Sequence, residues 1–63
     1  MDTYHVIDKQ TGEKLIGYHA NGGIYQFGRD GDPVPIYTTM SDMVRILDQI
    51  AGCTGRKLTV VLV

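Results

Sequence analysis

One amphipathic segment constrains the fold of this chain more than any other feature. Between Thr39 and Gly52, apolar residues recur at helical spacing and polar residues occupy most positions between them. The apolar positions are Met43, Val44, Ile46, Leu47, Ile50 and Ala51. Thr39 is the expected N-cap, Asp42 favours the positive end of the helix dipole, and Gly52 is expected to end the helix. All other segments have strand or turn patterns, so one helix has to cover the sheet that they form.

A first hairpin is predicted to join residues 4–9 to residues 13–20. The connection Gln10-Thr11-Gly12 fits a three-residue loop with glycine in the left-handed conformation. This register predicts two opposite-charge pairs across the strands, Lys9 with Glu13 and Asp8 with Lys14.

A second hairpin is predicted to turn at Asn21-Gly22, because both central residues of a type I′ turn need a positive φ. Its register pairs Ala20 with Gly23, His19 with Ile24, Tyr18 with Tyr25, and Ile16 with Phe27.

Together, the two registers assign residues to two faces of a three-stranded meander. The core face is expected to hold Tyr4, Val6, Ile16, Tyr18, Tyr25 and Phe27. The opposite face is expected to hold His5, Ile7, Leu15, His19, Ile24 and Gln26. Because a single helix covers one face only, this second face is a candidate protein-binding surface or dimer interface. Two alternatives stay open: its aliphatic residues are ordinary surface residues, or residues 34–38 fold over them.

Residues 28–33 form a turn-rich loop, and residues 34–38 are extended by pattern. Pro35 lacks an N–H, so this segment is an edge strand or no strand. The last segment, residues 58–63, is apolar on both faces except at Thr59, which favours an interior strand or an interface. We expect it to pair with the first strand. The sequence therefore predicts one α+β domain over residues 1–63, with the order β-β-β-(β)-α-β: a small antiparallel sheet with one helix packed on one face.

Composition argues against several classes of function. A 63-residue chain has material for one core and little for a deep catalytic cleft, and we expect a stability of about 3–5 kcal/mol. The net charge of -1 supplies no field for nucleic acid or anionic lipid. Cys53 is the only cysteine, so the chain has no internal disulfide and no Cys-x-x-Cys pair. Nucleotide-binding glycine motifs are also absent from the sequence.

The residues that could form a metal or catalytic site are explained more simply by structural roles, as surface residues or turn residues. His5 and His19 are expected about 7–8 Å apart on one face, but a metal site would need further ligands that the pattern does not supply. A pH-sensitive contact at these histidines is a weaker alternative. Asp30-Gly31-Asp32 lacks the later ligands of a calcium loop and is predicted to be a polar turn. We therefore predict no catalytic residue, metal or cofactor.

The predicted function is that of a non-enzymatic protein-binding module: a small regulator, inhibitor or accessory subunit that acts through a sheet face or edge. Its partner is a protein or a second copy of the chain, with nucleic acid disfavoured and no membrane segment. The alternative is a single-stranded nucleic-acid-binding domain that uses an aromatic sheet face. The first residues lack the basic and apolar regions of a signal peptide, which predicts a cytoplasmic protein.

Overall fold

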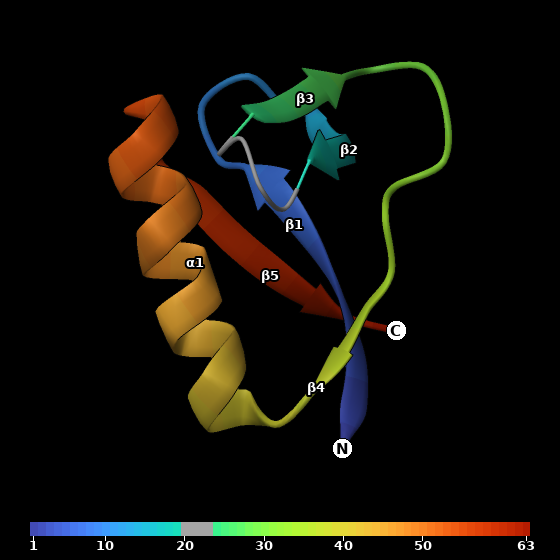
Figure 1. The fold of residues 1–63 in the computed structure, drawn as a ribbon. Coiled ribbons are helices and arrows are strands. Elements are labelled where there is room, and N and C mark those ends of the chain that lie inside the picture. Colours follow the sequence, from blue (N-terminus) through green and yellow to red (C-terminus); the bar gives the residue numbers. More distant parts are fainter. Residues whose placement is uncertain (20–23) are drawn as a thin grey trace.

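The computed structural model describes residues 1–19 and 24–63 (Figure 1). The turn predicted at Asn21-Gly22 and the predicted pair of Ala20 with Gly23 lie outside the described residues. The strands are β1 (Asp2–Asp8), β2 (Lys14–His19), β3 (Ile24–Gly28), β4 (Ile36–Thr38) and β5 (Leu58–Leu62), and the helix is α1 (Met40–Thr54). This is a small antiparallel sheet with one helix, which confirms the predicted α+β class and element order.

The sheet is organised around β1. On one edge β1 pairs with β5 along Tyr4–Asp8, which confirms the predicted pairing of the last strand with the first. On its other edge the start of β1 pairs with β4 and its end pairs with β2, which in turn pairs with β3. Within the described residues β5 pairs with β1 alone, so its prediction as an interior strand is wrong. β4 forms only after Pro35, whose missing N–H explains why the strand does not start earlier.

The β1–β2 connection is one residue longer than predicted. Ile7 pairs with Lys14, and the Asp8 N–H donates to the Glu13 carbonyl at 2.8 Å. The carboxylate of Asp8 accepts hydrogen bonds from the backbone N–H groups of the next residues, Gln10 at 2.8 Å and Thr11 at 3.2 Å. This local capping closes a four-residue loop that ends at Gly12, whose φ of 78° is the left-handed conformation expected of it. The predicted pairs of Lys9 with Glu13 and Asp8 with Lys14 are therefore wrong.

Shifting the register of a strand by one residue moves its side chains to the opposite face of the sheet. In β2 a bulge restores the predicted register with β3 for the second half of the strand only. Tyr18 pairs with Tyr25 and His19 with Ile24, as predicted, but Phe27 pairs with Leu15 instead of Ile16. The register shift lies between Leu15 and Gly17, which leaves Ile16 as the extra residue. The Leu15 carbonyl accepts a hydrogen bond from the Val34 N–H at 2.8 Å, so the loop before β4 is bonded to β2 at the bulge.

The core lies between the sheet and α1, and Leu15 belongs to it. Its buried apolar residues are Tyr4, Val6, Leu15, Met43, Ile50 and Leu58, and Tyr25, Phe27, Ile36, Ile46, Leu47, Ala51 and Val60 pack around them. Three residues predicted to face inward are not in this cluster: Ile16 is half-buried, and Tyr18 and Val44 are exposed. The bulge explains Ile16, whose Cδ1 atom lies 3.0 Å from the position that a Cβ on Gly28 would take.

The two ends of α1 follow different rules. Thr39 is the N-cap, as predicted, and its hydroxyl accepts a hydrogen bond from the Asp42 N–H at 3.3 Å. At the other end the prediction of Gly52 is wrong, because the helix continues to Thr54 and ends at Gly55. Gly55 has a φ of 71° and donates its N–H to the Ala51 carbonyl at 2.8 Å. A glycine is the usual residue at the end of a helix, so both Gly52 and Gly55 fit the sequence pattern, and the structure has the helix end at Gly55.

These two glycines give a matched pair of substitutions. Gly52→Ala is expected to raise the free energy of unfolding by up to about 1 kcal/mol, because alanine is the better helix former. A Cβ at Gly52 would meet no atom within 4 Å. Gly55→Ala is expected to lower the free energy of unfolding by about 1 kcal/mol, because its φ of 71° is strained for alanine. Urea denaturation measures both changes, and equal effects of the two substitutions would contradict the observed helix end.

Candidate protein-binding surface

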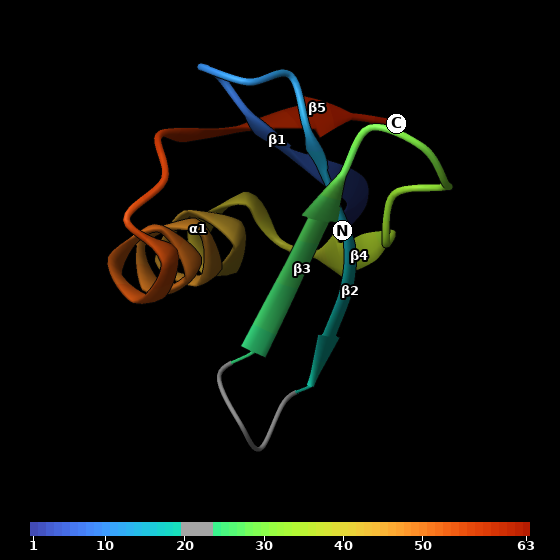
Figure 2. The same cartoon turned by 90° about the horizontal axis from the view of Figure 1, so that it is seen from above.

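Residues of β1, β4 and β5 that face away from α1 form one surface, which we call the outer face. Side chains alternate along a strand, so the neighbours of the buried residues Tyr4 and Val6 point to the opposite side. The observed registers extend this assignment across the strands. The outer face comprises Thr3, His5 and Ile7 on β1, Tyr37 on β4, Thr59 and Val61 on β5, and Val63 just beyond β5. Figure 2 shows α1 on the other side of β1 and β5.

The outer face is mostly apolar and accessible. Tyr37, Val61 and Val63 are 66%, 49% and 68% exposed, and the remaining members of the face are half-buried. None of its seven side chains is a carboxylate, a lysine or an arginine, and His5 is the one imidazole among them. Large exposed apolar side chains grouped on one face of a sheet are typical of protein contacts.

The structure divides the predicted binding residues among three places. His5 and Ile7 lie on the outer face, where the prediction put them. Leu15 is 0% exposed, so its placement on an open face is wrong, and the shifted β1–β2 register is the reason. His19, Ile24 and Gln26 are exposed on the β2–β3 hairpin, which runs steeply away from β1 and β5 (Figure 2). The structure therefore separates these three from the outer face.

For residues 58–63 the sequence favoured an interface as one alternative, but it did not place Val61 and Val63 among the predicted binding residues. Val61 and Val63 lie beside β1 residues of the outer face because Val61 pairs with His5 and the Val63 N–H donates to the Thr3 carbonyl at 2.8 Å. The predicted pairing of the last strand with the first, together with period-two alternation, was the signal that could have placed them.

The free edge of β5 adjoins the outer face. The Val63 N–H and the Lys57 carbonyl bond to β1, so the main-chain groups of every second residue between them also point to β1. The N–H and carbonyl groups of Val60 and Leu62 therefore point away from β1, and no described strand pairs with that edge. Unpaired edges of this kind accept an additional strand from a partner.

Three lysines lie at one end of the outer face. Lys14 pairs with Ile7, so its side chain is on the same face of the sheet as Ile7. The Lys9 N–H donates to the Lys57 carbonyl at 2.8 Å, so the pairing of β1 with β5 continues to these residues, and side-chain alternation places both on the same side of the sheet as the outer face. None of the three forms an ion pair with a described residue. The apolar outer face is therefore continued at one end by Lys9, Lys14 and Lys57, which we call the basic end.

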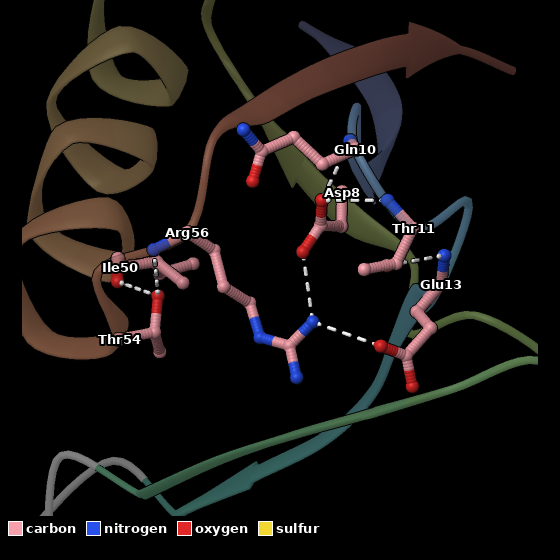
Figure 3. A network of polar contacts seen from close by, with 7 residues as sticks. All are labelled: Asp8, Gln10, Thr11, Glu13, Ile50, Thr54 and Arg56. Atoms are coloured by element: carbon pink, nitrogen blue, oxygen red, sulfur yellow. Dashed lines mark hydrogen bonds and ion pairs between the residues drawn. The ribbon is translucent and has the colours of Figure 1, made fainter.

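A polar network holds this basic end together (Figure 3). The Nη1 atom of Arg56 donates to Asp8 Oδ2 at 2.8 Å and to Glu13 Oε1 at 3.0 Å. Its guanidinium carbon lies 4.3 Å from the centroid of the Phe27 ring. Asp8 and Arg56 directly precede Lys9 and Lys57, so the ion pair lies next to the main-chain bond that joins the two lysines.

The network also determines the acidity of its carboxyl groups. Burial of the Asp8 carboxyl acts to raise its pKa, but hydrogen bonds from Gln10, Arg56 and Thr11 outweigh burial and hold the pKa below its ordinary value. The hydrogen bond from Arg56, helped by Thr11, lowers the pKa of Glu13. The pKa of Arg56 is raised by its bonds to Glu13 and Asp8. All three groups are held in their charged forms, which is typical of a structural ion-pair network.

Other features of the described residues offer less for chemistry. They contain no group of three or more His, Cys, Asp or Glu side chains that could hold a metal ion. Cys53 is free and exposed in the last turn of α1. An open hollow of about 210 Å³ lies between α1 and the β2–β3 hairpin. Its lining residues are Leu15, Tyr18, Tyr25, Ile36, Ile46, Gln49 and Ile50.

The aromatic residues, all of which are described, do not form one exposed platform. Tyr4 is in the core, Tyr25 and Phe27 pack against it, and Arg56 stacks on Phe27. Tyr18 and Tyr37 are exposed on different parts of the sheet, on β2 and β4. The rings on which a nucleic-acid-binding sheet would stack bases are therefore divided.

Comparison with protein-family models gives no match, and comparisons with curated proteins and with solved structures give no significant match. α1, the helix of the described residues, falls short of the length and apolar character that crossing a membrane requires.

Proposed function

We propose that this chain is a non-enzymatic protein-binding module, a small regulator, inhibitor or accessory subunit, that docks through the outer face and the adjoining edge of β5. One observation carries the proposal: α1 covers one side of the β1–β5 pair, and Tyr37, Val61 and Val63 are exposed together on the other. Burying such side chains against a partner contributes roughly 25 cal/mol for each Å² of apolar surface removed from water.

The proposed docking mode combines side-chain and main-chain contacts. The outer face supplies apolar side chains around His5, and Val60 and Leu62 offer unpaired N–H and carbonyl groups at the edge. A partner strand added at β5 would use both at once. The free thiol of Cys53 favours a reducing compartment, and we place the module in the cytoplasm.

Two exposed aliphatic residues give a matched test. Val61→Asp puts a carboxylate in the middle of the outer face, and Ile24→Asp makes the same kind of change on the β2–β3 hairpin at a position that is 56% exposed. The wild type and both variants serve as baits in cells that express the chain, with quantitative mass spectrometry. Each partner that is retained by Ile24→Asp and lost by Val61→Asp is then purified and titrated against the three proteins.

With the purified partner, Val61→Asp is expected to weaken binding by about a hundredfold, because the interface would bury an unpaired charge. Ile24→Asp is expected to leave the dissociation constant within about threefold of the wild type. Circular dichroism checks that both variants are folded. Equal binding of all three proteins, or loss of binding by Ile24→Asp alone, would contradict docking at the outer face.

A further inference from the structure

We infer that the partner presents an acidic protein surface, with apolar side chains that meet the outer face and carboxylates that meet Lys9, Lys14 and Lys57. This inference rests on the proposed function and adds the chemistry of the partner to it. Lys9, Lys14 and Lys57 are half of the six basic residues of the chain, although its net charge is -1.

The three lysines share one end of the outer face and have no counter-charge from the described residues. The Lys9 N–H donates to the Lys57 carbonyl at 2.8 Å, and the Cβ atoms of residues directly opposite each other on paired strands lie about 4.5–5.5 Å apart. Like charges on directly opposed residues are destabilising. Carboxylates from a partner would remove this repulsion and gain attraction from the same groups.

The ion pairs of the described residues involve two of the three arginines of the chain and none of its lysines. Arg56 is bound by Asp8 and Glu13, and Arg45 by Asp42 on the surface of α1. Lys9, Lys14 and Lys57 have no such partner among the described residues, and neither has Arg29, which stands alone in the loop after β3. The basic end is therefore the described part of the surface where a cationic cluster adjoins exposed apolar residues.

An acidic protein fits this surface better than the other candidates. The one aromatic side chain of the outer face, Tyr37, lies beside Thr3 at the end away from the lysines, and three lysines make a small footprint for a phosphate backbone. A second copy that stacked its own outer face would bring three more lysines and no carboxylate side chain, so it would leave the lysines of both copies without a counter-charge.

Selection from a phage-displayed library of random peptides on the immobilised chain at low salt tests this chemistry. The enriched peptides are expected to alternate apolar residues and to group Asp or Glu at one end. Their synthetic forms are titrated by fluorescence anisotropy. The double variant Lys9→Gln with Lys57→Gln is expected to weaken binding by about tenfold at low salt, and the difference should shrink as salt is added. Arg45→Gln, the control on α1, should bind as the wild type does.

A charge exchange sharpens the test. Lys57→Glu should reject the acidic peptide, and a peptide with its acidic residues replaced by lysine should regain binding to this variant. Single-stranded DNA and vesicles that contain phosphatidylserine are the other probes, and neither is expected to bind at physiological salt.

The outcomes separate this inference from the proposed function. Peptides that lose binding with Val61→Asp but not with the double lysine variant would overturn the acidic partner and leave docking at the outer face intact. Enrichment of peptides without acidic residues would also overturn the acidic partner and leave docking at the outer face intact. If no selected peptide is sensitive to Val61→Asp, or if only DNA or vesicles bind, both the inference and the proposed function are overturned.

Discussion

Replacing Leu15 with alanine is expected to lower the free energy of unfolding by about 2–5 kcal/mol, the usual cost of truncating a fully buried leucine. Leu15 is 0% exposed and packs in the cluster that contains Tyr4, Val6 and Ile50. Because domains of this size have only about 3–5 kcal/mol of stability, the variant should be largely unfolded at 25 °C. Thermal and urea denaturation monitored by circular dichroism measure the loss.

The neighbouring Ile16 is the control for this substitution. It is half-buried and lies outside the core cluster, so Ile16→Ala is expected to cost about 1 kcal/mol or less. The register predicted from the sequence gives the opposite order, with Ile16 in the core and Leu15 on the open face. A larger loss for Ile16→Ala than for Leu15→Ala would therefore restore the predicted register and contradict the bulge.

Asp8→Asn is expected to lower the stability at neutral pH and to reduce its dependence on acid. Asparagine keeps an oxygen that can accept from the Gln10 and Thr11 N–H groups but removes the charge that Arg56 binds. Asp8 is 3% exposed and its carboxylate has three partners, so few other changes on the sheet should cost as much. Asp8→Ala, which also removes the acceptor, should be less stable than Asp8→Asn.

The pH dependence follows from the direction of the pKa shifts. The folded-state pKa values of Asp8 and Glu13 lie below their ordinary values of 3.8 and 4.5. Such groups contribute stability that is present above the ordinary pKa values and is lost as the pH falls through the lower values of the folded protein. The difference in urea midpoint between wild type and Asp8→Asn should thus be largest near pH 7 and should narrow below pH 3.8.

Asp48→Asn, on the exposed surface of α1, is the matched control and should leave the acid profile of the wild type unchanged. A constant difference between wild type and Asp8→Asn from pH 7 to pH 2 would show that the charge of Asp8 contributes nothing, and would contradict the role assigned to Arg56.

Local patterns were sufficient to predict α1 and the strands β1, β2, β3 and β5, and they left β4 open. Helical spacing and the Thr39 cap placed α1, the alternation of β1 placed Tyr4 and Val6 in the core, and Gly12 took the left-handed conformation expected of it. These features depend on residues a few positions apart, so their free energies can be read from the sequence alone.

The candidate site could be predicted only in part. His5 and Ile7 lie on the outer face as expected, because the alternation of a single strand places them there. Leu15 lies in the core and not on the open face because the loop capped by the Asp8 carboxylate is one residue longer than predicted, which shifts the register of β2. The separation of His19, Ile24 and Gln26 from the outer face depends on the direction of the β2–β3 hairpin (Figure 2), which no local pattern fixes.

The sequence by itself determined the α+β class, the start of the helix and the pairing of the last strand with the first. The tertiary structure alone decided the β2 register, the end of α1 at Gly55 and the union of Val61 and Val63 with His5 on one surface. The physical reason is separation along the chain. Arg56 reaches Asp8 across 48 positions and Val34 bonds to Leu15 from a later loop. Contacts between such distant residues select one of several registers that local preferences leave close in free energy.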